Sequence, residues 1–155
     1  MVLGKSKINV MDWNSYFFNI AESVKLKSKD QNTQIGAVIV GKDKEILSTG
    51  YNSFPRGLDD TKTERQERPE KYFWFEHAER NAIYNAARIG VSTEGSEIYL
   101  TCDIPCPDCT RAIINAGIKK VHCKKGGGTK SEIWQEGFKR SAIMLQECGV
   151  EIQYY

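Results

Sequence analysis

The apolar residues of this chain recur at two spacings, one helical and one typical of buried strands. Apolar positions repeat every three or four residues after Asp12, a residue type that caps helix starts. Three further stretches with this spacing end at Gly90, Gly117 and Gly149, and glycine is common just after a helix. The sequence therefore predicts helices over residues 12–30, 77–88, 106–116 and 134–148.

Between the helical stretches lie short runs rich in β-branched and aromatic residues. The run from Ile35 to Val40 is apolar throughout, which is typical of a strand covered on both faces. A turn at residues 41–44 separates it from the next run, so the two predict a hairpin. The helix before the last run predicts a parallel crossover between the last two strands. The predicted strands are residues 33–40, 45–51, 97–102, 119–123 and 150–154.

Helices and strands alternate along the chain without an internal repeat, as expected when helices cover both faces of one sheet. We predict an α/β fold, a three-layer α/β/α sandwich around a central mixed sheet of about five strands. The last two strands are expected to be parallel. The 155 residues suffice for one hydrophobic core, so we expect a single domain over residues 1–155.

Composition limits the class of partner. The chain is 40% apolar and 27% charged, as globular domains are, and its net charge is +2 with bases and acids interspersed. This balance gives little reason to expect nucleic acid as a partner. No apolar run reaches the roughly 18 residues of a membrane helix, and the N-terminus lacks a secretion signal, so we expect no membrane partner. The odd number of five cysteines favours a reduced, cytoplasmic location over a disulfide framework.

Residues 52–75 form a long irregular segment, rich in charge and interrupted by proline and glycine. Loops of this length inside compact domains are usually functional or disordered. The segment ends in four aromatic residues, 72–75, which could stack on a base but which we interpret as core or subunit contact. The triple glycine at 126–128 is interpreted as a link, because it lacks the Lys-Ser/Thr ending of a phosphate loop.

The residues that could bind a metal or take part in catalysis lie in two motifs, His77-x-Glu79 and Cys106-x-x-Cys109. Pro105 precedes the second motif. One imidazole and two thiolates are three zinc ligands, which leave the fourth corner open as in catalytic sites. Cys106 and Cys109 lie on one face of a predicted helix start, where the helix dipole favours thiolates. His-x-Glu with a later Pro-Cys-x-x-Cys is the pattern of zinc nucleobase deaminases.

Glu79 is not needed as a ligand, and we expect it to carry protons. It would take a proton from zinc-bound water and pass it to a ring nitrogen and to the leaving amine. Zinc lowers the pKa of its water to about 7, so hydroxide would be available to attack C4 of a cytosine ring. We expect one catalytic Zn²⁺ per chain, held by His77, Cys106 and Cys109, with backbone near Ala78 bonding the base.

Other interpretations of these residues stay open. A lone Cys-x-x-Cys is also found as half of a structural zinc site or as a redox pair. A redox pair needs no His-x-Glu motif, which favours the catalytic interpretation, but a structural zinc needs only one more protein ligand. We expect His122 to be structural and the three remaining cysteines to be small buried hydrophobes. The candidates for a fourth ligand are Cys102, His122, Cys123 and Cys148.

With these motifs placed, most of the chain resembles the deoxycytidylate (dCMP) deaminase family of the zinc cytidine deaminase superfamily. Residues 50–57 are similar to the family's G-Y-N-G-x-P-x-G loop, residues 77–83 to its H-A-E-x-N-A-I motif, and residues 105–118 to P-C-x-x-C-x-x-x-I-I-x-A-G-I. The zinc motifs alone define the superfamily. The loop with Asn52 and the motif with Asn81 point to dCMP as substrate.

The resemblance implies that Asn52 contacts the sugar or phosphate and that Gly36, Ala37 and Ile104 lie near the base. A monophosphate also needs a cation near this loop. Arg56 is the first candidate, because arginine binds phosphate through two parallel hydrogen bonds. The next candidates, interpreted as solvated, are Lys62, Arg65 and Arg68.

The chain departs from the family pattern in two places. Ser53 stands where the loop usually has glycine, which restricts the backbone and leaves control by dCTP and dTTP open. The segment between Gly57 and His77 carries no further cysteine or histidine, so we expect no accessory zinc site.

The sequence favours hydrolytic deamination of dCMP to dUMP and ammonia, which supplies dUMP for thymidylate synthesis. The alternatives are the same chemistry on dCTP, on a free nucleoside, or on a cytidine or adenosine within RNA. A more remote alternative is a non-catalytic nucleotide-binding zinc protein. The expected partners are dCMP, dCTP and dTTP as candidate effectors, and further copies of this chain, with a hexamer most expected.

Overall fold

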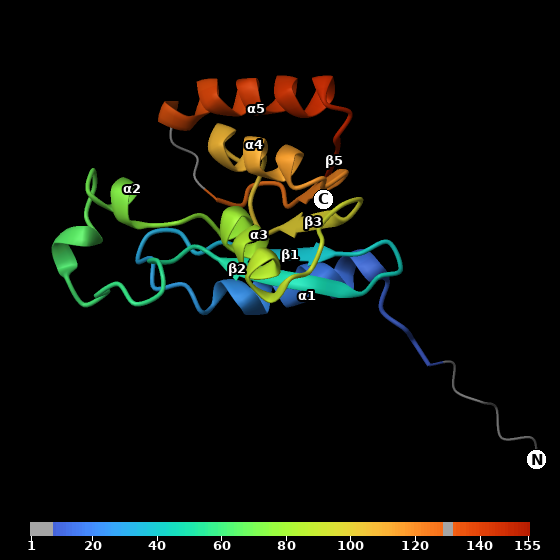
Figure 1. Ribbon diagram of the computed structural model, residues 1–155, viewed down its shortest axis with the longest axis horizontal. Helices are drawn as coiled ribbons and strands as arrows, with labels where there is room; N and C mark the ends of the chain where they lie inside the picture. The colour runs from blue at the N-terminus through green and yellow to red at the C-terminus, as the bar shows by residue number, and fades with distance from the viewer. Residues whose placement is uncertain (1–7, 129–131) are drawn as a thin grey trace, which may run out of the picture.

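A five-stranded sheet organises the molecule, whose computed structural model describes residues 8–128 and 132–155 (Figure 1). The strand order is β2-β1-β3-β4-β5; β1 pairs antiparallel with β2 and β3, while β3, β4 and β5 are parallel. The predicted mixed sheet with parallel last strands is confirmed. The strands are β1 Gly36–Val40, β2 Ile46–Tyr51, β3 Glu97–Leu100, β4 Lys120–Cys123 and β5 Glu151–Tyr154.

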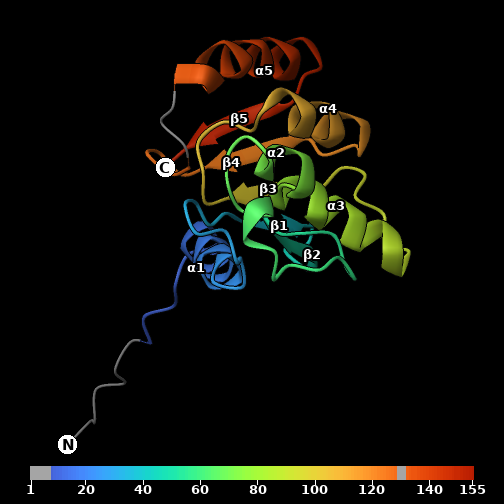
Figure 2. The same ribbon diagram turned by 90° about the vertical axis from the view of Figure 1, so that its left-hand side faces the viewer.

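Helices cover both faces of this sheet and make the predicted three layers. Helix α1 lies on one face, and α3, α4 and α5 lie on the other (Figures 1 and 2). Two short 3-10 turns and the four-residue α2 complete the fold. The helices are α1 Trp13–Lys25, α2 Lys71–Trp74, α3 Ala78–Ile89, α4 Pro107–Asn115 and α5 Gln135–Glu147, and the turns are η1 Thr63–Arg65 and η2 Glu132–Trp134.

Strand β1 is buried along its whole length because α1 and α3 press on it and on β2 from opposite sides. Two glycines permit this close packing. A Cβ on Gly36 would lie 2.1 Å from the carbonyl oxygen of Ala21 in α1. A Cβ on Gly50 would lie 2.3 Å from the backbone nitrogen of Ala82 in α3. The position of α3, which begins beside the candidate metal ligands, therefore depends on the absence of a side chain at Gly50.

The predicted first helix, 12–30, is too long at its end. Helix α1 stops at Lys25, because the residues after it make tertiary bonds instead. The Ser28 hydroxyl donates to the carbonyl of Asn52, and Asp30 pairs with Lys71. The first strand likewise begins at Gly36 rather than at residue 33.

The three cysteines outside the metal motif have different surroundings. Cys123 is fully buried in β4, as predicted, and burial raises the pKa of its thiol to about 12. Cys102 is half-buried and packs against the core. The prediction for Cys148 is wrong: it is exposed, because it caps the C-terminal end of α5. Within residues 8–128 and 132–155, no helix has the length and apolar character to span a membrane.

Candidate active site

Two helix starts bring the three candidate metal ligands together. His77 is the N-cap of α3, Cys106 is the N-cap of α4, and Cys109 lies in the first turn of α4. The Nδ1 atom of His77 is 3.4 Å from the sulfur of Cys106 and 3.4 Å from that of Cys109. Cys106 and Cys109, which follow His77 by 29 and 32 residues in the sequence, thus lie next to it in the fold.

The spacing of these atoms fits a zinc ion. Bond lengths of 2.0–2.3 Å in a tetrahedron place neighbouring ligand atoms about 3.5 Å apart, close to the observed separations. Among the described residues, the group consists of His77, Cys106 and Cys109, so none of the four candidates for a fourth protein ligand joins it. His122 is instead engaged in β4, where it stacks on Tyr99 and bonds Glu97. Three protein ligands leave one corner for water or substrate, as in catalytic zinc sites.

The three ligand side chains shift one another's pKa values in different directions. A hydrogen bond from Cys109 lowers the pKa of Cys106 to about 4, despite the opposing effect of burial, which favours the thiolate form of Cys106. The same bond and burial raise the pKa of Cys109, which keeps its proton until a cation replaces it. Burial by itself lowers the pKa of His77, but the neighbouring Cys106 and Glu79 charges raise it overall.

Glu79 stands beside the ligands in the first turn of α3 and lines the same cavity. Its side chain is buried, and burial raises the pKa of the carboxyl while the charge of His77 partly opposes that shift. A carboxyl with a raised pKa exchanges protons more readily near neutral pH. Glu79 lies outside the group of three candidate metal ligands, and its burial and raised pKa are properties that suit a proton carrier.

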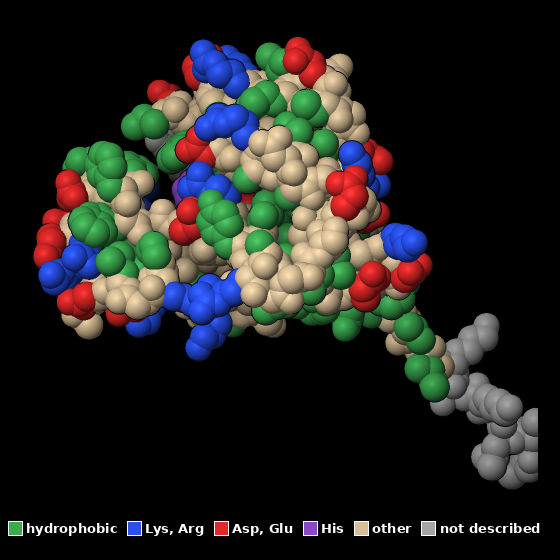
Figure 3. All heavy atoms as spheres, in the orientation of Figure 1, with side chains coloured by type: hydrophobic (Ala, Val, Ile, Leu, Met, Phe, Trp, Pro, Cys, Tyr) green, Lys and Arg blue, Asp and Glu red, His purple; other side chains and the backbone are tan. Residues whose placement is uncertain are grey.

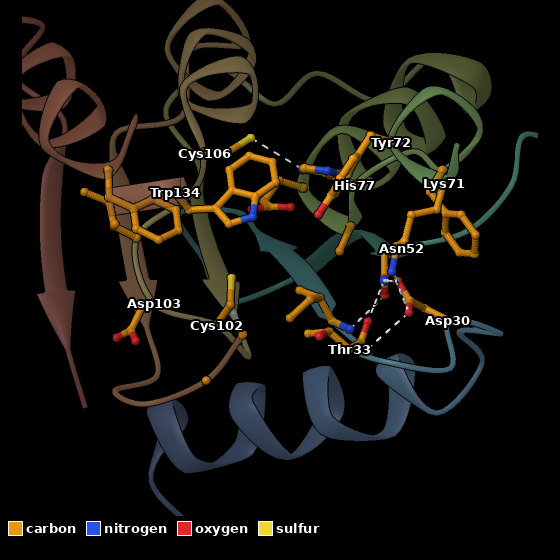
Figure 4. A pocket seen from close by; sticks show the side chains of 18 of the residues that line it. Asp30, Thr33, Asn52, Lys71, Tyr72, His77, Cys102, Asp103, Cys106 and Trp134 are labelled. Atoms are coloured by element: carbon orange, nitrogen blue, oxygen red, sulfur yellow. Dashed lines mark hydrogen bonds and ion pairs between the residues drawn. The ribbon is translucent and has the colours of Figure 1, made fainter. Parts of the chain in front are cut away.

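The cavity next to this group encloses about 870 Å³, its open mouth included. On the side opposite the metal ligands, Lys71 of α2 donates to both carboxylate oxygens of Asp30, at 3.0 and 2.8 Å. Asp30 also accepts from the side-chain amide of Asn52, so the three polar side chains form one buried network (Figure 4).

Asn52, the predicted sugar or phosphate contact, lies at the cavity wall, and its side-chain amide bonds other parts of the chain. Its nitrogen donates to Asp30 at 3.2 Å and to the carbonyl of Thr33 at 2.7 Å. Its oxygen accepts from the backbone of Ile35 at 2.8 Å. Asn52 thus joins the segment before β1 to the loop after β2.

The structure brings some of the predicted base contacts to the cavity and not others. Ala78 and Ile104 line it. Gly36 and Ala37 do not: both are buried in β1, where the backbone of Gly36 donates to the Thr101 hydroxyl. The cavity wall in this part is formed by Ile35, one residue earlier in the chain.

Arg56 lies away from the metal ligands. It lines a separate hollow formed by the loop after β2 and by α3, and it donates to the side chain of Asn85 at 2.7 Å. The arginine at the metal cavity is Arg68, whose guanidinium lies 5.9 Å from the centre of the Tyr72 ring. Arg65 packs on the ring of Trp74 instead.

Sequence reasoning missed most of the aromatic lining. Tyr72 and Phe75 belong to the aromatic run interpreted as core or subunit contact, yet both line the cavity, and Phe75 also packs on Phe54. Trp134 and Phe138 line it from the start of α5. Their only sequence signal is a pair of large aromatics four residues apart at a helix start, which is also ordinary for core packing. Further lining residues without a motif are Asp30, Thr33, Lys71, Cys102, Asp103, Gly127 and Gly128.

Comparison with known proteins gives the family. The model of the cytidine and deoxycytidylate deaminase zinc-binding region matches residues 11–125. The chain belongs to this family. A deoxycytidylate deaminase from Homo sapiens is 35% identical over 122 residues, which cover 76% of this chain and 67% of that protein. An uncharacterized deaminase of the luxG 3′ region in Aliivibrio fischeri is 39% identical over 145 residues, 94% of this chain and 95% of that one.

Solved structures agree with this deaminase assignment. The apo dCMP deaminase of cyanophage S-TIM5 superposes with a TM-score of 0.71 and 29% identity, over 92% of this chain and 96% of that one. The complex of that enzyme with dCMP and dUMP gives a TM-score of 0.67 and 26% identity, over 92% and 93%. The predicted resemblance to the dCMP deaminase family is confirmed, and the chain is a hydrolase of that family.

Proposed function

We propose that this deaminase converts dCMP and water to dUMP and ammonia, using one Zn²⁺ held by His77, Cys106 and Cys109. The observation that carries the proposal is the three-ligand group with the buried Glu79 at the wall of one cavity. Relatives named as deoxycytidylate deaminases and the cyanophage enzyme with dCMP and dUMP support the choice of substrate.

The residues divide the chemistry between them. When bound, zinc supplies the Lewis acidity that brings the pKa of a ligated water to about 7. Glu79 accepts one proton from the attacking water and delivers it to N3 of the cytosine ring. It then takes the second proton from the same oxygen, now bonded to C4, and passes it to the amine that leaves C4. The C4–N bond breaks and a C4–O bond forms, so water and dCMP become dUMP and ammonia. The backbone N–H of Ala78, in the first turn of α3, lacks an intrahelical acceptor and is free to donate to the base.

Arg68 is the better candidate for the phosphate contact than Arg56. Two cations line the cavity, Arg68 and Lys71, and the charge of Lys71 is offset by Asp30. Arg68 is exposed at the cavity and pairs with no carboxylate among the described ion pairs. A single uncompensated arginine suits one phosphate group, which favours the monophosphate over dCTP.

Charge also argues against a nucleic-acid substrate. Basic and acidic side chains are interspersed on the face shown in Figure 3, which shows no continuous basic track along it. An RNA editor would need such a track for the phosphate backbone.

The proposal also covers the metabolic role, assembly and regulation of the enzyme. A single-domain cytoplasmic deaminase of this kind would supply dUMP for thymidylate synthesis. We expect several copies of the chain to assemble, a hexamer first, and we keep dCTP and dTTP as candidate effectors. Light scattering of the zinc-loaded protein, with and without each triphosphate, measures assembly and its response.

Turnover tests the proposal directly. Purified zinc-loaded protein is incubated with dCMP, dCTP, deoxycytidine and a tRNA anticodon stem, and ammonia release and ultraviolet loss of cytosine are followed. The proposal predicts the highest kcat/KM for dCMP. Absence of dCMP turnover in protein with one zinc per chain would refute it, and a higher kcat/KM for dCTP would replace the substrate.

A further inference from the structure

Three aromatic side chains from two distant parts of the sequence meet at the metal cavity. We call Tyr72, Trp134 and Phe138 the aromatic roof. The ring of Trp134 is 6.0 Å from that of Tyr72 and 6.5 Å from that of Phe138, between ring centres. All three residues line the cavity. Trp134 is the central member, and in Figure 4 its indole extends from the backbone toward His77 and Cys106.

The position of Trp134 is fixed by the packing of α5 on α4. A Cβ on Gly137 would lie 3.2 Å from two carbons of the Pro107 ring. The absence of a side chain at Gly137 therefore lets the first turn of α5 rest on the first turn of α4. Pro107 directly follows Cys106, so this contact holds Trp134 next to the metal ligands.

The indole of Trp134 lies close to the candidate metal ligands. The centre of the Trp134 ring is 6.3 Å from the centre of the His77 ring, and the two planes meet at 62°. Both rings line the cavity, so the indole is an immediate neighbour of the ligand group. A base whose C4 faces the ligand group and Glu79 is within contact distance of the indole.

We propose that Trp134 binds the nucleobase by stacking and holds C4 at the metal group, which makes it a base-binding residue of this enzyme. The inference rests on the proposed function, because it assumes that a pyrimidine nucleotide occupies this cavity. Base–aromatic stacking changes affinity by roughly 5- to 150-fold when the aromatic ring is removed. Tyr72 and Phe138 then act as positioning residues that support the indole from either side.

Tryptophan fluorescence reports this contact without turnover. The chain has three tryptophans, and Trp13 and Trp74 do not line the cavity. Titration of the zinc-loaded protein with the product dUMP should quench its emission. The quench should persist in Trp13→Phe and Trp74→Phe and disappear in Trp134→Phe, while equilibrium dialysis shows that each variant binds dUMP.

Kinetics separate binding from a general structural role. Trp134→Ala should raise KM for dCMP by about tenfold or more and leave kcat within about threefold, with one zinc per chain retained. Trp134→Phe keeps an aromatic face and should raise KM by less than about threefold. A quench that survives in Trp134→Phe, or a KM unchanged in Trp134→Ala, would overturn the inference and leave the proposed function intact. Failure of every variant and of the parent protein to bind dUMP in dialysis would instead overturn both.

Discussion

Two parts of the cavity wall are held in place by different interactions. On one side, His77, Glu79, Cys106 and Cys109 take their positions from the first turns of α3 and α4. On the other side, Lys71, Asp30 and Asn52 are held by side-chain bonds across 22 to 41 residues of sequence. We call these the metal wall and the polar wall.

Because the two walls are held in place differently, changes to them should affect different properties of the protein. The metal wall depends on backbone geometry at two helix starts, so its ligand atoms meet once the helices pack on the sheet. The polar wall depends on a buried ion pair, whose charges tolerate little change because an unpaired charge in the interior is costly. Damage to the metal wall should abolish turnover and spare folding of the rest, whereas damage to the polar wall should first reduce stability.

The largest effect on activity is expected from Cys106→Ser. The hydroxyl is a far weaker zinc ligand than a thiolate, so we expect the protein to lose its zinc and all detectable dCMP turnover. Zinc content by atomic emission and ammonia release provide the measurement. Cys148→Ser is the matched control, because Cys148 is exposed and should change neither value. Full activity of the Cys106 variant with zinc retained would contradict the assignment of the metal wall.

The largest effect on stability is expected from Lys71→Met, which leaves the Asp30 carboxylate buried without its cation. Loss of one partner of a buried ion pair costs about 3–5 kcal/mol, and the hydrogen bonds that Asp30 keeps place the value near the lower end. Urea unfolding of the zinc-loaded protein measures it. The double variant Asp30→Asn with Lys71→Met should recover part of the loss. Equal stability of the single variant and the parent protein would show that the polar wall is not held by this pair.

A smaller effect distinguishes the two arginines. Arg68→Ala should raise KM for dCMP by roughly tenfold, since a charge-assisted hydrogen bond is worth about 1.5–3 kcal/mol. Arg56→Ala removes the same side chain from the separate hollow and should leave KM within about twofold. Steady-state kinetics with dCMP and with deoxycytidine, which has no phosphate, show whether the loss is specific to the nucleotide. The reverse ranking of the two variants would place the phosphate at Arg56.

The smallest effect is expected outside both walls, at His122. Burial lowers the pKa of this imidazole in the folded protein, against the raising effect of its bond to Glu97. The unfolded chain therefore binds the proton more readily, so the stabilisation from neutral His122 is present above about pH 6.5 and is lost as the pH falls below it. Stability measured from pH 7.5 to 5 should fall less steeply in His122→Gln than in the parent protein. Identical slopes would show that His122 does not contribute to acid sensitivity.

The contrast between the walls also explains what the sequence can predict. The metal wall follows from residue types at fixed spacing, because His77, Glu79, Cys106 and Cys109 each stand at the start of a recognisable helix. The mixed sheet with parallel last strands and the three layers follow from apolar runs and a helical crossover, whereas the strand order is seen only in the structure.

The remaining parts of the site depend on contacts that no local pattern contains. Lys71 looks like any surface lysine of a charged loop until Asp30 meets it across 41 residues. Trp134 at the end of η2 and Tyr72 in α2 become neighbours only in the folded chain. Arg56 follows the family loop in sequence, yet its side chain turns toward Asn85 in α3. Long-range packing, rather than spacing, decides these positions.

The central claim is that Glu79 moves protons for a zinc ion that it does not bind, and Glu79→Gln tests it most directly. The amide keeps the shape of the side chain but has no proton to exchange, so kcat for dCMP should fall by about 10²- to 10⁴-fold or more. The zinc content should stay at one ion per chain, and dUMP should still bind in dialysis. Loss of zinc from the variant, or a kcat within about threefold of the parent protein, would contradict the account.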